Sequence, residues 1–180
     1  FVECLNNFYG ELKKKLAKYD EFESKFIEDL TYDHSNTLDI MYVFDRLINR
    51  NIKREWSLKH NFFNPEDRQL RKKFNIEHWY PQNSKINLDD KVDIHNIGNL
   101  LVIPNKLNKI LQNHTPKKKA ELIREDKQFY SITYVNDFIQ EYKDDLESWD
   151  NNIIKLRANK LAYKVYNQTW KFDPPNIKIN

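Results

Sequence analysis

Cysteine, glycine and methionine are scarce in this 180-residue sequence, which has one cysteine, two glycines and one methionine. Because Cys4 is the only cysteine, the chain can form neither an internal disulfide framework nor a four-cysteine zinc site. No strand is followed by a Gly-rich phosphate loop, so we expect no nucleotide hydrolysis by this chain. No apolar run approaches the roughly 18 residues of a membrane span, and no signal peptide opens the sequence. These absences favour a cytoplasmic protein without a membrane partner.

Apolar and aromatic residues are well represented, at 39% and 14% of the sequence, which is enough for one sizeable core. We predict a single domain, mainly α-helical with a small β-hairpin. Its parts are a helical segment 1–73, a central motif 74–113 and a helical segment 114–180. Since the sequence begins inside a helical pattern, we expect a C-terminal fragment of a longer protein.

Apolar residues at helical spacing predict the helices on both sides of the central motif. The predicted helical segments are 1–18, 19–30, 37–49, a short helix after Pro65, 116–124, 134–142 and 148–170. In segment 37–49 the residues expected to face inward are Leu38, Met41, Phe44, Leu47 and Ile48.

Potential acid/base and metal-binding side chains gather between Ile76 and Asn113 only. The alternating pattern of Phe74–Trp79 predicts a short strand that ends before Pro81. The apolar run Asn99–Ile103 predicts a second strand, and the proline that follows it suits the first turn of a helix. We expect a tight turn at Gly98, just before this second strand.

Four side chains in this window suit the hydrolysis of a phosphodiester, which needs a base for the attacking water and a cation for the charge on phosphate. His78 suits the base, because an unperturbed imidazole is largely neutral at pH 7. Glu77 and the amide oxygen of Asn108 are hard ligands that match Mg²⁺ or Mn²⁺ better than zinc. Asn99 could brace the histidine loop from the second shell. Glu77 and His78 are adjacent on the predicted strand and would face opposite sides of it. We therefore expect Pro81 to bend the backbone so that His78, Glu77 and Asn108 converge on one cation.

Basic residues flank the motif in segments 51–73 and 104–127, whereas acids dominate between residues 134 and 150. Lysines beside phosphates give sequence-independent, salt-sensitive binding to nucleic acid. Lys117, Lys118 and Lys119 therefore either contact nucleic acid or are solvated helix residues. His95 either contacts a substrate phosphate or caps the turn into the second strand.

The window resembles the HNH, or ββα-metal, nuclease motif. The resemblance is to the variant in the C-terminal domain of GmrSD-type modification-dependent restriction nucleases and related phage-defence proteins. The pattern is Glu-His-x-x-Pro-Gln, then His-x-x-Gly-Asn-Leu, then Leu-Asn and a lysine-rich turn. The residues that match it are Glu77, His78, Pro81, Gln82, His95, Gly98, Asn99, Leu100, Leu107, Asn108, Asn113 and Lys117 to Lys119. The match continues through Trp149, Ile153, Arg157 and Leu161, and it covers about residues 36 to 170.

The resemblance implies a helical scaffold around a ββα-metal motif and a metal-dependent DNA endonuclease. His78 would be the general base, Glu77 and Asn108 the ligands of Mg²⁺ or Mn²⁺, and Asn99 the central bracing residue. It also implies 5′-phosphate and 3′-hydroxyl products and an N-terminal domain that hydrolyses nucleotides and senses DNA modification. Asn108 and Glu77 depart from the His and Asp of the HNH domain in RNA-guided Cas nucleases.

One motif in the chain predicts a nickase, which cuts one strand per active site. Two alternatives stay open at this point. One is a noncatalytic nucleic-acid-binding module that has kept the fold. The other is an RNase, because nothing among these residues reads a 2′-hydroxyl.

Overall fold

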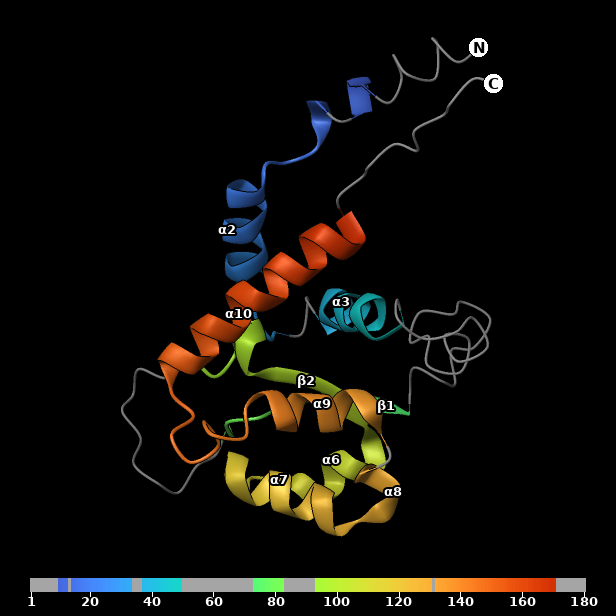
Figure 1. The fold of residues 1–180 in the computed structure, drawn as a ribbon, viewed down its shortest axis with the longest axis vertical. Coiled ribbons are helices and arrows are strands. Elements are labelled where there is room, and N and C mark those ends of the chain that lie inside the picture. Colours follow the sequence, from blue (N-terminus) through green and yellow to red (C-terminus); the bar gives the residue numbers. More distant parts are fainter. Residues whose placement is uncertain are drawn as a thin grey trace.

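The computed structural model describes residues 10–12, 14–33, 37–49, 73–82, 93–130 and 132–170. Two strands lie between helices α3 and α10 on one side and helices α6, α7 and α8 on the other (Figure 1). The elements in chain order are α2 (Tyr19–Asp29), α3 (Thr37–Asn49), β1 (Phe74–His78), η1 (Ile97–Asn99), β2 (Leu100–Pro104), α6 (Asn105–Leu111), α7 (Pro116–Glu125), α8 (Lys127–Tyr130), α9 (Thr133–Glu141), α10 (Asn151–Val165) and η2 (Tyr166–Trp170). A mainly helical chain with one small sheet agrees with the predicted fold class.

Strands β1 and β2 pair antiparallel over their full lengths, with Phe74 opposite Pro104 and His78 opposite Leu100. The second strand starts one residue later than predicted. Asn99 belongs instead to the 3₁₀ turn η1, where its backbone N–H donates to the oxygen of Asn96 at 2.8 Å. Its carbonyl then accepts the N–H of Trp79 at 2.8 Å, so the turn joins the sheet at the end of β1.

Helix α10 packs directly against turn η1. Gly98 lies in the expected turn before β2, but it has no positive φ, so the turn by itself does not require a glycine. The reason for the glycine is close approach, because a Cβ on Gly98 would lie 2.0 Å from the backbone oxygen of Ile154. One turn along α10, Arg157 donates from Nη1 to the backbone oxygens of Gly98 at 2.6 Å and Leu100 at 2.8 Å. Helix α10 therefore fixes the turn that precedes β2.

An aromatic cluster fills the space between the sheet and helix α9. The ring of Phe138 lies edge to face with Trp79, at a centroid distance of 4.8 Å, and with Trp149 at 5.8 Å. The guanidinium of Arg157 lies over the Phe138 ring at 4.6 Å. Burial lowers the pKa of Arg157 to about 10, so the group stays charged at neutral pH. Trp79, which is fully buried, is thus a core residue and is not available for stacking on nucleotide bases.

Helix boundaries in the second half of the chain follow from capping. Helix α7 begins with Pro116 after Thr115, whose Oγ1 accepts the N–H of Lys118 at 3.4 Å. Helix α10 begins after Asp150, whose Oδ1 accepts the N–H of Ile153 at 3.0 Å. Such caps satisfy N–H groups that have no partner within the helix. The short helix α8 was not predicted from the sequence.

The boundaries of α3 match the prediction, but its inward face does not match fully. Leu38 is 50% exposed, whereas Ile40 is fully buried beside Met41. At 100° per residue the buried stripe of α3 includes position 40 and leaves position 38 outside it. In the predicted first helix, Leu12 and Leu16 are both 37% exposed. Residues 1–9 and 13 of that predicted helix and the segment after Pro65 up to residue 72 lie outside the described residues.

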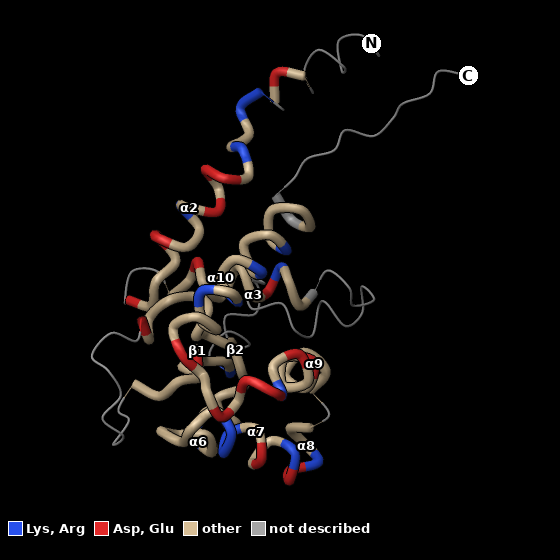
Figure 2. The backbone as a smooth tube through the Cα atoms, turned by 60° about the vertical axis from the view of Figure 1, so that its left-hand side comes forward, with Lys and Arg blue, Asp and Glu red and all other residues tan. Residues whose placement is uncertain are grey.

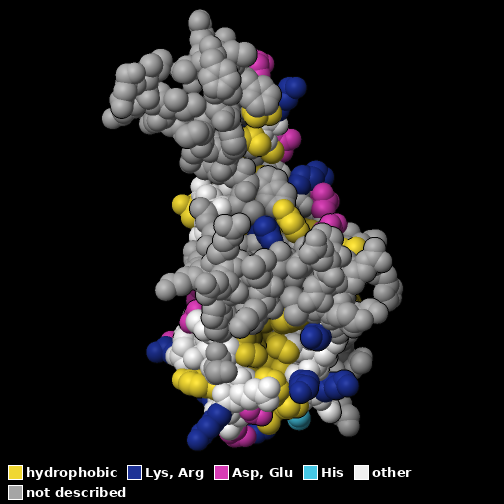
Figure 3. All heavy atoms as spheres, turned by 90° about the vertical axis from the view of Figure 1, so that its right-hand side faces the viewer, with side chains coloured by type: hydrophobic (Ala, Val, Ile, Leu, Met, Phe, Trp, Pro, Cys, Tyr) yellow, Lys and Arg dark blue, Asp and Glu magenta, His cyan; other side chains and the backbone are white. Residues whose placement is uncertain are grey.

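The described surface carries charges of both signs. Basic and acidic residues lie close together along the helices, including α7 below strand β1 (Figure 2). On one face, hydrophobic side chains lie among Lys and Arg side chains in the lower part of the molecule (Figure 3). No helix in the described part of the chain is long and apolar enough to cross a membrane.

Candidate active site

One face of strand β1 presents Glu77 to helices α6 and α7. The carboxylate is 5% exposed, and each of its oxygens has a partner. Oε2 accepts Nδ2 of Asn108 on α6 at 2.7 Å, and Oε1 is 2.5 Å from Nζ of Lys119 on α7. Glu77 and Asn108, which the sequence predicts as metal ligands, are therefore neighbours in space although 31 residues separate them.

The opposite face of β1 presents His78 to a second set of side chains. Its Nε2 lies 3.3 Å from Nδ1 of His95 and 3.3 Å from Nε2 of Gln82. The ring of Tyr32 meets the imidazole edge to face at a centroid distance of 4.6 Å. His78 is only 7% exposed, but His95 and Gln82 are both exposed. Both hydrogen-bonding neighbours of Nε2 are therefore side chains that solvent can reach.

The sequence predicted that His78, Glu77 and Asn108 converge on one cation, and this prediction requires a correction. His78 and Glu77 have separate sets of partners in the described residues, because adjacent residues of an extended strand face opposite sides. Pro81 lies beyond the end of β1 and does not bring the two side chains onto one face. What joins the two faces is Lys119, whose Nζ also donates to the backbone oxygen of His78 at 2.6 Å.

Asn99 has the bracing position that the sequence predicts. This fully buried amide accepts the backbone N–H of Tyr80 at 2.8 Å and the indole N–H of Trp149 at 3.1 Å. Its Nδ2 donates to the backbone oxygens of Tyr80 at 3.0 Å and Ile94 at 2.8 Å. One side chain thereby ties the segment after His78 to the loop before η1 and to the start of α10.

We expect Asn99→Ala to lower the free energy of unfolding by about 2–3 kcal/mol. The change leaves the buried N–H groups of Tyr80 and Trp149 without acceptors, and each costs its desolvation energy. Chemical denaturation would measure the loss. Asn96→Ala serves as a comparison, because its amide accepts one N–H, that of Gly98. Equal stability of the Asn99→Ala variant and the unsubstituted protein would contradict the bracing role.

The expectation for Lys119 as a surface lysine has to be corrected. Its side chain is fully buried, so its ammonium group does not reach a phosphate at the surface. The signal was present in the sequence, since Lys119 shares the inward helical spacing of Pro116, Ala120 and Ile123. Lys118 is exposed and pairs with Glu121 at 3.3 Å. Lys117, also exposed, pairs with Glu147.

Burial shifts the pKa values of the central groups. Burial, with smaller contributions from the nearby His95 and Lys119, lowers the pKa of His78 to about 4. The imidazole is therefore neutral at pH 7, with a lone pair free to accept a proton. Burial raises the pKa of the Glu77 carboxyl, and Lys119 opposes that rise. Burial also lowers the pKa of the Lys119 ammonium, and Glu77 opposes that fall.

The oxygen donors beside Glu77 fit a hard divalent cation such as Mg²⁺ or Mn²⁺ better than zinc. No group of three or more His, Cys, Asp or Glu side chains that could hold a metal lies within the described ranges. Mg²⁺ needs fewer protein ligands, because it keeps several waters and is often bound through one or two carboxylates plus substrate phosphate. Glu77 offers Oε2, and a half turn of the Asn108 amide would place its oxygen beside it. These two residues therefore fit Mg²⁺ or Mn²⁺.

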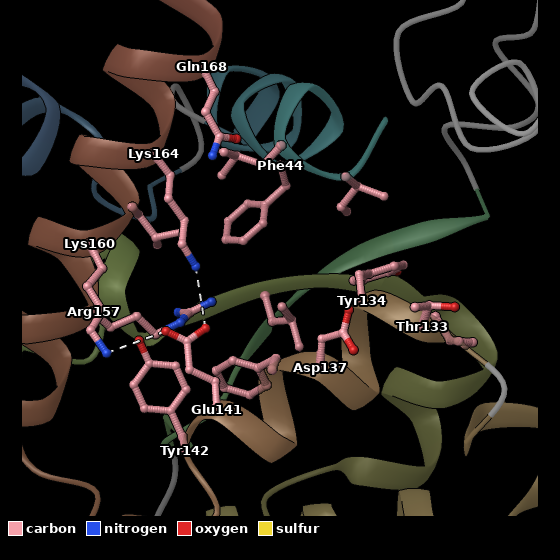
Figure 4. Close-up of a pocket in the computed structure, with 16 residues that line it drawn as sticks. Phe44, Thr133, Tyr134, Asp137, Glu141, Tyr142, Arg157, Lys160, Lys164 and Gln168 are labelled. Carbon is pink, nitrogen blue, oxygen red and sulfur yellow. Dashed lines mark hydrogen bonds and ion pairs between the residues drawn. The ribbon is translucent and has the colours of Figure 1, made fainter. Parts of the chain in front are cut away.

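A pocket of about 670 Å³ lies away from these residues, between α3, β2, α9 and α10 (Figure 4). Its wall includes Arg157 and a bridge in which Glu141 accepts Lys160 and Lys164, both at 3.4 Å. None of the predicted site residues lines it. The candidate active site is thus the end of β1 and not this pocket.

Comparison with known proteins gives one match. The family described as GmrSD restriction endonucleases, C-terminal domain, matches residues 16–164, which is most of the chain and includes every predicted site residue. No curated protein and no solved structure matches. The family resemblance drawn from Glu77, His78, Asn99 and Asn108 is thereby confirmed. The chain belongs to the C-terminal domain family of the GmrSD restriction endonucleases.

Proposed function

We propose that this domain is a metal-dependent DNA endonuclease of the HNH type that nicks one strand of a duplex. Family membership supports a nuclease of a restriction system. The observation that carries the finer proposal is the end of strand β1. A buried, neutral His78 lies there next to Glu77, which is paired with the amide of Asn108 on the other face of the strand. His78 as a base and Glu77 as an oxygen ligand are adjacent in the chain, and Asn108 adds a second oxygen ligand. These groups suit phosphodiester hydrolysis.

His78 would accept a proton at Nε2 from the attacking water. The two contacts of this nitrogen are long, so water can replace the exposed side chains of His95 or Gln82. The water oxygen then bonds to phosphorus in line with the departing 3′ oxygen. The bond from phosphorus to the 3′ oxygen breaks, that oxygen takes up a proton from solvent, and a 5′-phosphate and a 3′-hydroxyl are left. Asn99 would keep the segment after His78 in place during the step.

Glu77 and Asn108 would hold Mg²⁺ or Mn²⁺. When bound, the cation supplies positive charge that stabilises the charge on the nonbridging and leaving oxygens. Lys117 and Lys118 are exposed on α7 and would contact backbone phosphates, and His95 would contact phosphate from the other face. We further propose that the domain acts in the cytoplasm beside an N-terminal nucleotide-hydrolysing, modification-sensing domain.

Nicking of supercoiled plasmid tests this function. We expect open-circular product with Mg²⁺ or Mn²⁺ and none when EDTA removes the cation. Asn108→Ala should raise the Mg²⁺ concentration needed for half-maximal nicking, because one oxygen ligand is lost. Ile110→Ala is the matched control on the same helix, since Ile110 is 41% exposed and lies outside the site. Undiminished nicking in excess EDTA would contradict the metal-dependent reading.

The two alternatives predict different results in the same assays. An RNase would cleave single-stranded or duplex RNA faster than plasmid DNA under equal Mg²⁺. A noncatalytic module would bind DNA in a salt-sensitive way but would cleave neither substrate with Mg²⁺ or Mn²⁺. Parallel assays on DNA and RNA therefore separate all three functions.

A further inference from the structure

The ammonium group of Lys119 lies beneath the end of strand β1 and contacts three oxygens. Nζ is 2.5 Å from Oε1 of Glu77, 2.6 Å from the backbone oxygen of His78 and 3.2 Å from that of Trp79. An ammonium has three N–H bonds, one for each oxygen. A neutral amine would turn its lone pair toward one of these acceptors. The contacts therefore favour a charged lysine in a fully buried position.

We propose that Lys119 is a positioning residue of the active site, in addition to the site residues already described. One ammonium group bonds both Glu77, on one face of β1, and the backbone of His78, whose imidazole lies on the other face. It thereby fixes the Glu77 carboxylate relative to the backbone from which the His78 side chain extends. This inference rests on the proposed function, because it assigns His78 and Glu77 to the same reaction.

Packing alone does not account for a lysine at this position. A buried ion pair costs several kcal/mol of desolvation per ion, and replacing it with apolar residues of similar volume is often neutral or stabilising. Lys119 lies on the inward stripe of α7 with Ala120 and Ile123, where apolar residues in place of both Lys119 and Glu77 would pack helix against strand without that cost. A cation is needed only if something must be held by charge and by three directed hydrogen bonds. Here those partners are the Glu77 carboxylate and two carbonyl groups at the end of β1.

Replacing the missing atoms with a small amine tests the proposal. Lys119→Ala removes the side chain beyond Cβ, and propylammonium supplies the same three carbons and ammonium group. We expect nicking per folded molecule to fall about 10- to 100-fold, the usual effect of removing a second-shell partner of a site. Saturating propylammonium should restore a measurable part of the rate. Propan-1-ol, which has the same shape without the charge, should not.

Lys155→Ala is the matched control, because it removes an exposed lysine of helix α10 that has no part in the proposed site. Propylammonium should not raise its rate. Two results would overturn the proposal: a Lys119→Ala variant that nicks as fast per folded molecule as the unsubstituted protein, or equal rescue by the amine and the alcohol.

A second measurement covers the case in which Lys119→Ala does not fold. Glu77→Gln combined with Lys119→Met removes both buried charges together, which avoids an unpaired ion. The NMR signal of the His78 ring in this double variant is compared with that in Glu77→Gln alone. We expect it to shift or broaden, because the carbonyls of His78 and Trp79 lose their donor. An unchanged signal would overturn the proposal. This readout needs no catalysis, so it remains valid if the protein proves not to be a nuclease.

Discussion

Gly98→Ala is expected to lower the free energy of unfolding by at least about 4 kcal/mol, or to prevent folding. The added methyl carbon would lie 2.0 Å from the backbone oxygen of Ile154 and 2.8 Å from its carbonyl carbon. The added methyl carbon would be fixed to the backbone of turn η1, and the atoms that it meets belong to the backbone of helix α10. Neither can move aside as a side chain can. Relief requires α10 to shift away from η1, which would break the bonds from Arg157 to this turn. Thermal unfolding should show a loss of more than about 10 °C.

The second glycine provides the control. A Cβ on Gly10 would meet no atom of the described structure within 4 Å. Gly10→Ala lies in a helical, exposed position and should leave the melting temperature unchanged or slightly raised, because alanine favours the helix. A Gly98→Ala protein that melts within about 2 °C of the Gly10→Ala protein would show that the approach of α10 to η1 is not tight.

His78→Ala should reduce plasmid nicking by about 10²- to 10⁴-fold at saturating Mg²⁺, the range for loss of an acid/base group. The reason is the loss of the neutral imidazole nitrogen that would accept the proton of water. Single-turnover rates measure the step directly, because they exclude product release. The fold should survive, since the core contacts of Trp79 and the bonds of Asn99 do not involve the imidazole.

His114→Ala is the matched histidine control, because His114 is exposed and lies beyond helix α6. We expect less than about a threefold change there, which is far below the effect of losing a general base. If His78→Ala and the control nick equally fast, His78 is not the base. If both variants lose activity only in proportion to lost folded protein, the effect is structural.

Much of the fold could be predicted because its signals are local. Helix α3 has the predicted ends, and α7 begins at Pro116 as expected from the proline. Strand β1 followed from the alternation of apolar residues from Phe74. The exposure of Leu38 was missed because two inward stripes fit its helix almost equally well, and contacts from other elements decide between them. Gly98 was assigned to a turn because the sequence gives no sign that Ile154 approaches it.

The roles of the predicted site residues stay predictions, but the arrangement of these residues can be compared with the structure. Asn99 and the pairing of Glu77 with Asn108 follow the family pattern and occur in the structure. The separation of Glu77 from His78 onto opposite faces followed from strand geometry, but the expected bend does not remove it. Lys119 was grouped with its surface neighbours because a run of three lysines resembles a phosphate-binding patch. Its inward helical spacing with Pro116 and Ile123 was the signal that distinguishes it from Lys117 and Lys118.

The indole N–H of Trp149 reaches the amide of Asn99 from 50 residues further along the chain. Arg157 likewise bonds the backbone of Gly98 from 59 residues away. A peptide cut to residues 74–113 would carry the proposed base and both proposed ligands and yet lose these two supports. Grafting that segment onto another scaffold should therefore fail unless the host protein also supplies an indole to bond Asn99 and a guanidinium to bond the backbone of Gly98. For protein engineering, the transferable unit is the motif together with Lys119 of α7 and the segment from Trp149 to Arg157.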